Sequence, residues 1–74
     1  MSKLPLLKAL QLIKILKKLD FSQVRQKGSH IFFSHPDGRT TVVPFHQSKT
    51  IGRGLLRSIL NDINISPEEF RKIA

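Results

Sequence analysis

Two short apolar runs separated by a tight turn constrain this 74-residue chain more than any other feature. The run from His30 to His35 puts Ile31 and Phe33 on one side of an extended strand, because successive side chains point to opposite faces. Pro36-Asp37-Gly38-Arg39 has the composition of a tight turn, and Thr40 to Pro44 is a second run of strand-forming residues. The pattern predicts a β-hairpin with one buried face.

A third strand is predicted just before this hairpin. Phe21 to Gln26 alternates loosely, with Phe21 and Val24 as its apolar anchors, and Lys27-Gly28-Ser29 is typical of a turn. If Ile31 and Phe33 face the core, then His30 and Phe32 lie side by side on the open face of the sheet.

Helices are predicted on both sides of the strands. Apolar residues recur at three- and four-residue spacing from Ser2 to Leu19, and Pro5 limits the helix start to a position between Ser2 and Lys8. The same segment carries more apolar residues than one stripe needs. These are either further core residues, which we favour, or a surface that a partner covers; they are Leu4, Leu6, Leu7, Leu10 and Ile15.

After a polar loop from Phe45 to Ile51, Gly52-Arg53-Gly54 opens a second predicted helix. Asn64 suits the left-handed residue that ends it, and Ser66-Pro67-Glu68-Glu69 predicts a capped last helix that runs to about Ile73. The apolar face of the second helix comprises Leu55, Leu56, Ile59, Leu60 and Ile63. The element order predicts an α+β fold, with helices on one face of a three-stranded antiparallel sheet.

Composition limits the class of protein. The length predicts a single domain over residues 1–74, and the absence of cysteine fits a reducing cytoplasm. Lysines interrupt the leucine-rich start, so it is neither a signal peptide nor a membrane span. The formal net charge of +8 points to a polyanion, which can be nucleic acid, an anionic membrane surface or an acidic protein.

The candidate chemistry is concentrated at the start of the second strand. His30 follows the basic segment Arg25-Gln26-Lys27-Gly28-Ser29, so an imidazole stands beside groups that bind phosphate. The plainer interpretation is an ordinary histidine on an open sheet face. Phe32 could stack on a base, although a half-buried sheet residue is the better explanation.

Other polar groups have weaker patterns. Lys49 and Arg53 flank the start of the second helix, where they either contact phosphate or remain in solvent. His35 faces away from His30 by alternation, and His46 lies beyond Pro44, so we interpret both as structural or hydrogen-bonding residues and predict no metal site or cofactor.

The ordered set of these segments closely resembles the HicA family of mRNA interferase toxins. The resemblance runs from about Phe21 to Phe70 and rests on motifs spread along the whole segment. They are Arg25-Gln26-Lys27-Gly28-Ser29-His30, His35-Pro36-Asp37-Gly38-Arg39, Val43-Pro44, His46 and Gly52-Arg53-Gly54-Leu55-Leu56-Arg57-Ser58-Ile59-Leu60. Two positions depart from the family: Lys8, where many relatives have a serine cap, and Asp20-Phe21, where many have Gly-Phe.

This resemblance implies a fold like that of double-stranded-RNA-binding domains. It also implies a cytoplasmic ribonuclease that cleaves mRNA and arrests growth, with His30 as its catalytic residue and a HicB-like antitoxin as its partner. Because RNA cleavage without a metal needs a base and donors to the phosphate, His30 is the candidate base or acid. Arg25, Lys27 and Arg39 are candidate phosphate contacts, and Ser29 could orient the site. Two rivals stay open: a non-catalytic RNA-binding module, and a small basic protein that binds only an acidic partner.

Overall fold

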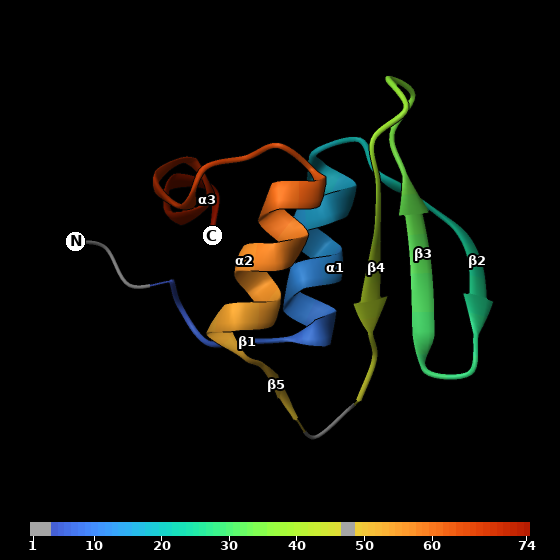
Figure 1. The fold of residues 1–74 in the computed structure, drawn as a ribbon, viewed down its shortest axis with the longest axis horizontal. Coiled ribbons are helices and arrows are strands. Elements are labelled where there is room, and N and C mark those ends of the chain that lie inside the picture. The colour runs from blue at the N-terminus through green and yellow to red at the C-terminus, as the bar shows by residue number, and fades with distance from the viewer. Residues whose placement is uncertain (1–3, 47–48) are drawn as a thin grey trace.

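The computed structural model describes residues 4–46 and 49–74 and contains the predicted antiparallel sheet (Figure 1). Strands β2 (Ser22–Lys27), β3 (His30–Ser34) and β4 (Thr40–Pro44) pair in the order β2-β3-β4, with both neighbouring pairs antiparallel. The fold class is therefore confirmed as α+β, with a three-stranded antiparallel sheet and three helices.

The helices and the sheet share one core. Helices α1 (Ala9–Lys18) and α2 (Arg53–Asp62) both contact β4, and α3 (Pro67–Ile73) lies on the far side of them from the sheet (Figure 1). The sheet contributes alternate residues of β3 and β4 to this core, as a half-buried strand should. They are Ile31, Phe33, Thr41 and Val43, which meet buried leucines and isoleucines of both long helices.

Strand β2 lies outside this core. All six of its residues are exposed, because the helices contact β4 and stop short of the outer strand. The expectation that Val24 anchors the strand was therefore wrong, since its side chain is 60% exposed and the register with β3 shifts between Gln23 and Arg25. A bulge of this kind on an edge strand also hinders pairing with another chain.

Both long helices end in the same backbone motif. In α1 the N–H groups of Asp20 and Phe21 donate to the carbonyls of Lys17 and Leu16, and Asp20 takes a φ of 70°. This is a Schellman ending with aspartate at a position that favours glycine. The chain repeats the motif after α2, where Asn64 has a φ of 58° as the sequence predicts.

The start of α1 is less well capped. Lys8 is its N-cap, at the last position of the predicted range, and the Ser2–Lys3 part of that range lies outside the described residues. The ammonium group of Lys8 cannot accept a hydrogen bond, so only the reverse half of a capping box forms, from the Lys8 N–H to the Gln11 side chain at 2.9 Å.

The predicted loop from Phe45 to Ile51 contains a strand that sequence analysis missed. Thr50–Ile51 forms β5 and pairs antiparallel with β1 (Leu7–Lys8), although Gln47 and Ser48 lie outside the described residues. This ladder holds the starts of α1 and α2 together, because one helix follows β1 and the other follows β5.

The extra apolar residues near the N-terminus divide into two groups. Leu4, Leu7 and Ile15 are buried, which confirms the interpretation as core, whereas Leu6 and Leu10 are more than half exposed. Leu55 was wrongly assigned to the buried face of α2, since 41% of it is exposed. In the part of the chain that the structure describes, no helix is long and apolar enough to cross a membrane.

Candidate nucleic-acid interface

The open face of the sheet is built from rows of directly paired residues. Lys27 lies opposite His30, and His30 lies opposite Pro44, so these three side chains share one face and one row. The turn that joins β2 to β3 makes this register possible, because Gly28 adopts a φ of 59° as its first residue. The imidazole of His30 is thereby held at the end of a rigid ladder while staying exposed.

The next row joins a cation to an aromatic ring. Arg25 pairs with Phe32, and its guanidinium carbon lies 4.8 Å from the centre of the Phe32 ring. A planar cation over an aromatic face is favourable by about 0.5–1 kcal/mol at an exposed site. Arg25 therefore lies over Phe32 on the open face of the sheet, in the row beside His30.

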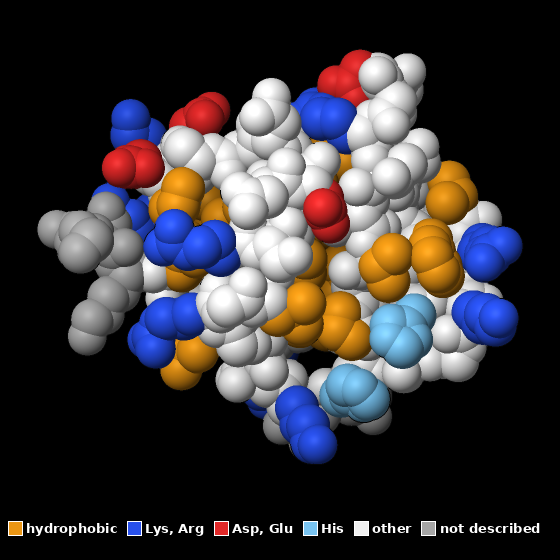
Figure 2. Space-filling model, viewed as in Figure 1, with side chains coloured by type: hydrophobic (Ala, Val, Ile, Leu, Met, Phe, Trp, Pro, Cys, Tyr) orange, Lys and Arg blue, Asp and Glu red, His pale blue; other side chains and the backbone are white. Residues whose placement is uncertain are grey.

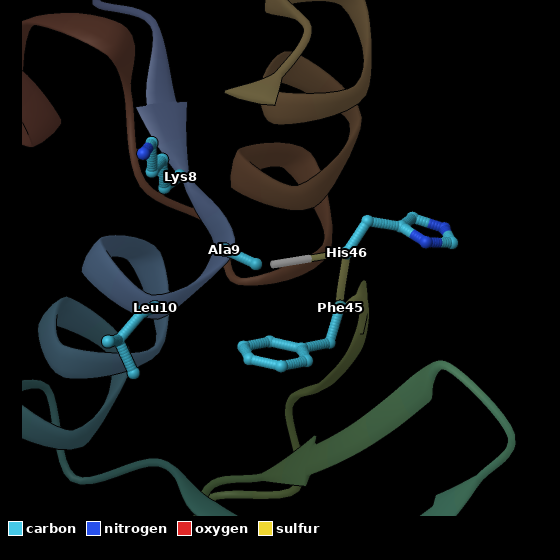
Figure 3. Close-up of a pocket in the computed structure, with 5 residues that line it drawn as sticks. All are labelled: Lys8, Ala9, Leu10, Phe45 and His46. Carbon is cyan, nitrogen blue, oxygen red and sulfur yellow. The ribbon is translucent and has the colours of Figure 1, made fainter. Parts of the chain in front are cut away.

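The chain just after β4 is fixed against the same end of the sheet. The Phe45 N–H donates to the Ser29 carbonyl at 2.6 Å, which extends the hairpin ladder by one residue beyond Pro44. Phe45 also packs against the core, and its ring points toward Leu10 at the start of α1 (Figure 3). A pocket of about 260 Å³ opens there, between α1 and residues 45–46.

Charges are unevenly distributed between the two ends of the molecule. In Figure 2 histidine side chains lie over the end where β2 turns into β3, with Lys, Arg and apolar side chains around them, and further Lys and Arg side chains lie on the opposite side of the molecule. Three of the five carboxylates lie at the opposite end of the sheet: Asp20 follows α1, Asp37 is in the β3–β4 turn and Asp62 ends α2. Glu68 and Glu69 begin α3. The starts of α1 and α2, which are the positive ends of helix dipoles, lie at the carboxylate-free end.

A comparison with known families identifies the family of the chain. The family model described as the HicA toxin of bacterial toxin–antitoxin systems matches residues 10–65. The chain belongs to the HicA toxin family. It is thus the toxin component of such a system, and toxins of this family pair with an antitoxin. No curated protein sequence matches the chain closely enough to add a relative.

The predicted phosphate contacts of the toxin fall into two groups. Lys27 lies in the same row as His30 and Arg25 lies in the next row, while Ser29 precedes His30 in the turn. Arg39 lies at the other end of β3, beyond the last paired row. Its guanidinium donates to the Asp37 carboxylate at 2.8 Å and to the Ile63 carbonyl, so it ties the β3–β4 turn to the end of α2.

The two cations near α2 also differ in their contacts. Arg53, the first residue of α2, donates from Nε to the Leu4 carbonyl at 2.8 Å and so ties the N-terminal segment to the helix. Lys49 is exposed, and its N–H donates to the His46 carbonyl at 3.1 Å just before β5. Lys49 therefore lies close to His46, whereas one donor of Arg53, its Nε–H, is used in a structural contact.

The histidines of the toxin have distinct surroundings. His35 is structural, as expected: its Nδ1 accepts the Asp37 N–H at 3.0 Å, and its ring meets Phe21 edge-on at 5.0 Å. His46 is exposed, and within residues 4–46 and 49–74 its imidazole forms no hydrogen bond. Among those residues no group of three or more potential ligands is placed to hold a metal ion.

Sequence reasoning missed that His46 lies at the same end as His30. The available signal was the register, since Pro44 was predicted to end a strand that pairs with the one that His30 begins. His46 is two residues after Pro44, so in an extended segment its side chain points to the same face of the sheet as those of Pro44 and His30.

Proposed function

We propose that this toxin is a cytoplasmic endoribonuclease that cleaves mRNA without a metal ion and uses His30 as its general base. The observation that carries the proposal is the row in which Lys27 lies directly opposite His30, with Arg25 in the next row. A proton-transfer group and two phosphate-binding cations thus share one exposed surface.

The chemistry needs few groups. His30 takes the proton of a ribose 2′-hydroxyl, and the resulting oxygen attacks the adjacent phosphorus of the same nucleotide. Histidine suits this task as a residue type, because the reference pKa of an imidazole, ~6.5, lies close to working pH. General-base catalysis of this kind contributes about 10²–10⁴-fold to a rate.

Lys27 and Arg25 stabilise the negative charge that builds up on the phosphate oxygens. Lysine supplies a mobile point charge, and arginine supplies a planar fork that Phe32 holds against the sheet. Ser29, in the turn beside His30, helps to position the substrate. We assign Lys49 and Arg53 to the RNA strand beyond the cleaved bond, because they lie at the end that has no carboxylates.

The proposed partner is a HicB-like antitoxin with an acidic surface that covers the open face of the sheet. The charge of this face complements such a partner, and contact there hides His30 from RNA. The formal charge of +8 makes the toxin attractive to either polyanion, so antitoxin and RNA compete.

The test is incubation of the purified toxin with end-labelled RNA in EDTA, followed by separation of the fragments. The parent should cleave, and His30→Gln should slow cleavage by about 10²-fold or more. Lys14→Gln, an exposed change on α1, is the matched control and should cleave like the parent. Cleavage by His30→Gln at the parental rate would refute the role of His30.

Two other outcomes separate the rival functions. Binding of RNA by the parent without new fragments favours a non-catalytic RNA-binding module. The absence of any salt-sensitive RNA affinity favours a small basic protein whose only partner is an acidic protein.

A further inference from the structure

The proposed reaction leaves one proton unassigned, and the register of the sheet identifies a residue that can supply it. When the 2′-oxygen attacks phosphorus, the 5′-oxygen that departs must be protonated. We propose that His46 is the general acid that protonates this leaving oxygen. The proposal rests on the proposed function, because it concerns the second half of the same reaction.

The face on which His46 lies follows from three observations. Pro44 is directly paired with His30, so their side chains are on the same face. The Phe45 N–H bond to the Ser29 carbonyl continues the ladder by one residue. In Figure 3 the Phe45 ring points to α1 and the His46 ring points away from it, as alternation in an extended segment requires.

The register of the ladder predicts a separation of the two imidazoles that suits a shared phosphate. His46 is two residues beyond the partner of His30, which makes the pair a diagonal neighbour across the ladder. Diagonal neighbours in an antiparallel sheet are about 7–8 Å apart. Such a spacing would accommodate one phosphate between two rings, and histidine side chains are visible over this end of the sheet in Figure 2.

The backbone of His46 is held on both sides. Phe45 packs against the core before it, and the His46 carbonyl accepts the Lys49 N–H at 3.1 Å after it. The imidazole itself is exposed and forms no hydrogen bond within the described residues. The backbone of His46 is therefore positioned by its neighbours, while its ring stays accessible to a large ligand that a general acid must reach.

The proton balance of the step is complete. Neutral His30 accepts the 2′-hydroxyl proton while the bond from the 2′-oxygen to phosphorus forms. The bond from phosphorus to the 5′-oxygen breaks, and the imidazolium of His46 donates its proton to that oxygen. The products are a 2′,3′-cyclic phosphate and a 5′-hydroxyl, with His30 now charged and His46 neutral.

The test compares two leaving groups. The cleavage site is first mapped with the parent on a defined RNA oligonucleotide. A second oligonucleotide then carries sulfur in place of the bridging 5′-oxygen at that site. A thiolate departs without being protonated, so a general acid is dispensable on the sulfur substrate and essential on the oxygen substrate.

We expect His46→Gln to slow cleavage of the oxygen substrate by about 10²–10⁴-fold. On the sulfur substrate we expect the same variant to cleave at a near-parental rate, because the thiolate needs no acid. His30→Gln should be slow on both substrates, because the base acts before either leaving group departs. Lys14→Gln is the control for substitution as such. Circular dichroism melting and binding of an uncleavable 2′-deoxy analogue should be the same for parent and His46→Gln.

Each contrary result has a distinct meaning. A parental rate of His46→Gln on the oxygen substrate overturns the role of His46 and leaves the proposed function intact. Equal losses on both substrates show that His46 does not act as the acid. Rescue of His30→Gln by sulfur reverses the roles and overturns this assignment. If the parent cleaves neither substrate, the proposed function fails together with the inference.

Discussion

Replacement of Arg25 by glutamine isolates the contribution of the stacked guanidinium on the open sheet. The side chain of Arg25 lies 4.8 Å from the centre of the Phe32 ring, in the row beside His30. Glutamine keeps a polar side chain of moderate length there and removes the charge. If Arg25 neutralises one RNA phosphate, the change removes one counterion-release event on binding.

The magnitude follows from single-strand electrolyte effects. Each phosphate contact contributes ~0.7 to the slope of log affinity against log salt concentration. When the salt concentration rises from ~50 to ~200 mM, the RNA affinities of parent and variant both fall. Because Arg25→Gln makes one phosphate contact fewer, its fall in affinity should be ~2.6-fold smaller than that of the parent. The assay is fluorescence anisotropy of a labelled, uncleavable 2′-deoxy analogue, titrated with toxin over that salt range.

Two further variants are controls for the slope of log affinity against log salt concentration. Arg71→Gln makes the same chemical change on α3, outside the matched segment, and should keep the parental slope. Arg25→Lys keeps the charge and should also keep it, with a lower affinity because the planar stack is lost. An Arg25→Gln slope equal to that of the parent would show that Arg25 contacts no phosphate, and the reasoning from its stacked geometry would be wrong.

Three further predictions concern stability, each measured by thermal unfolding. Asp20→Gly should raise the free energy of unfolding by about 0.5–1 kcal/mol, because Asp20 has a φ of 70° at a helix end, whereas Asp20→Ala should lower it. Thr41→Val should cost ~1 kcal/mol, since it removes a 3.0 Å hydrogen bond from a buried hydroxyl to α2; Thr40→Val, on the exposed face, is its control and should cost little. The N–H of Arg39 donates to Asp37 and, with the Arg39 charge, lowers the pKa of that carboxyl. The stability that the ionised Asp37 carboxylate adds to the folded state is present at neutral pH and is lost as pH falls below the usual carboxyl range. The stability advantage of the parent over Asp37→Asn should therefore disappear in acid.

Much of the fold follows from local patterns. The alternation in β3 and β4 correctly separates Ile31 and Phe33 from the open-face pair His30 and Phe32. Asn64 has the left-handed backbone that its place after a helix predicts. These features depend on steric and periodic rules that act within a few residues, so one sequence is enough to predict them.

The missed features depend on contacts that are distant in sequence. The β1–β5 ladder joins pairs of residues more than 40 positions apart, and each strand is too short to show alternation. Val24 is exposed because the helices pack mainly against β4, and the coverage of a sheet is decided by packing angles rather than by strand composition. Arg53 has a backbone partner at Leu4 that charge patterning cannot predict.

The placement of the carboxylates gives the molecule a permanent electric dipole as well as a net charge. Three of them lie at the end of the sheet where β3 turns into β4, and the starts of α1 and α2 lie at the other end. In the field of a polyanion such a molecule experiences a torque that turns its carboxylate-free end forward. The toxin should therefore approach a polyanion already oriented, and added salt should weaken this orientation during the approach.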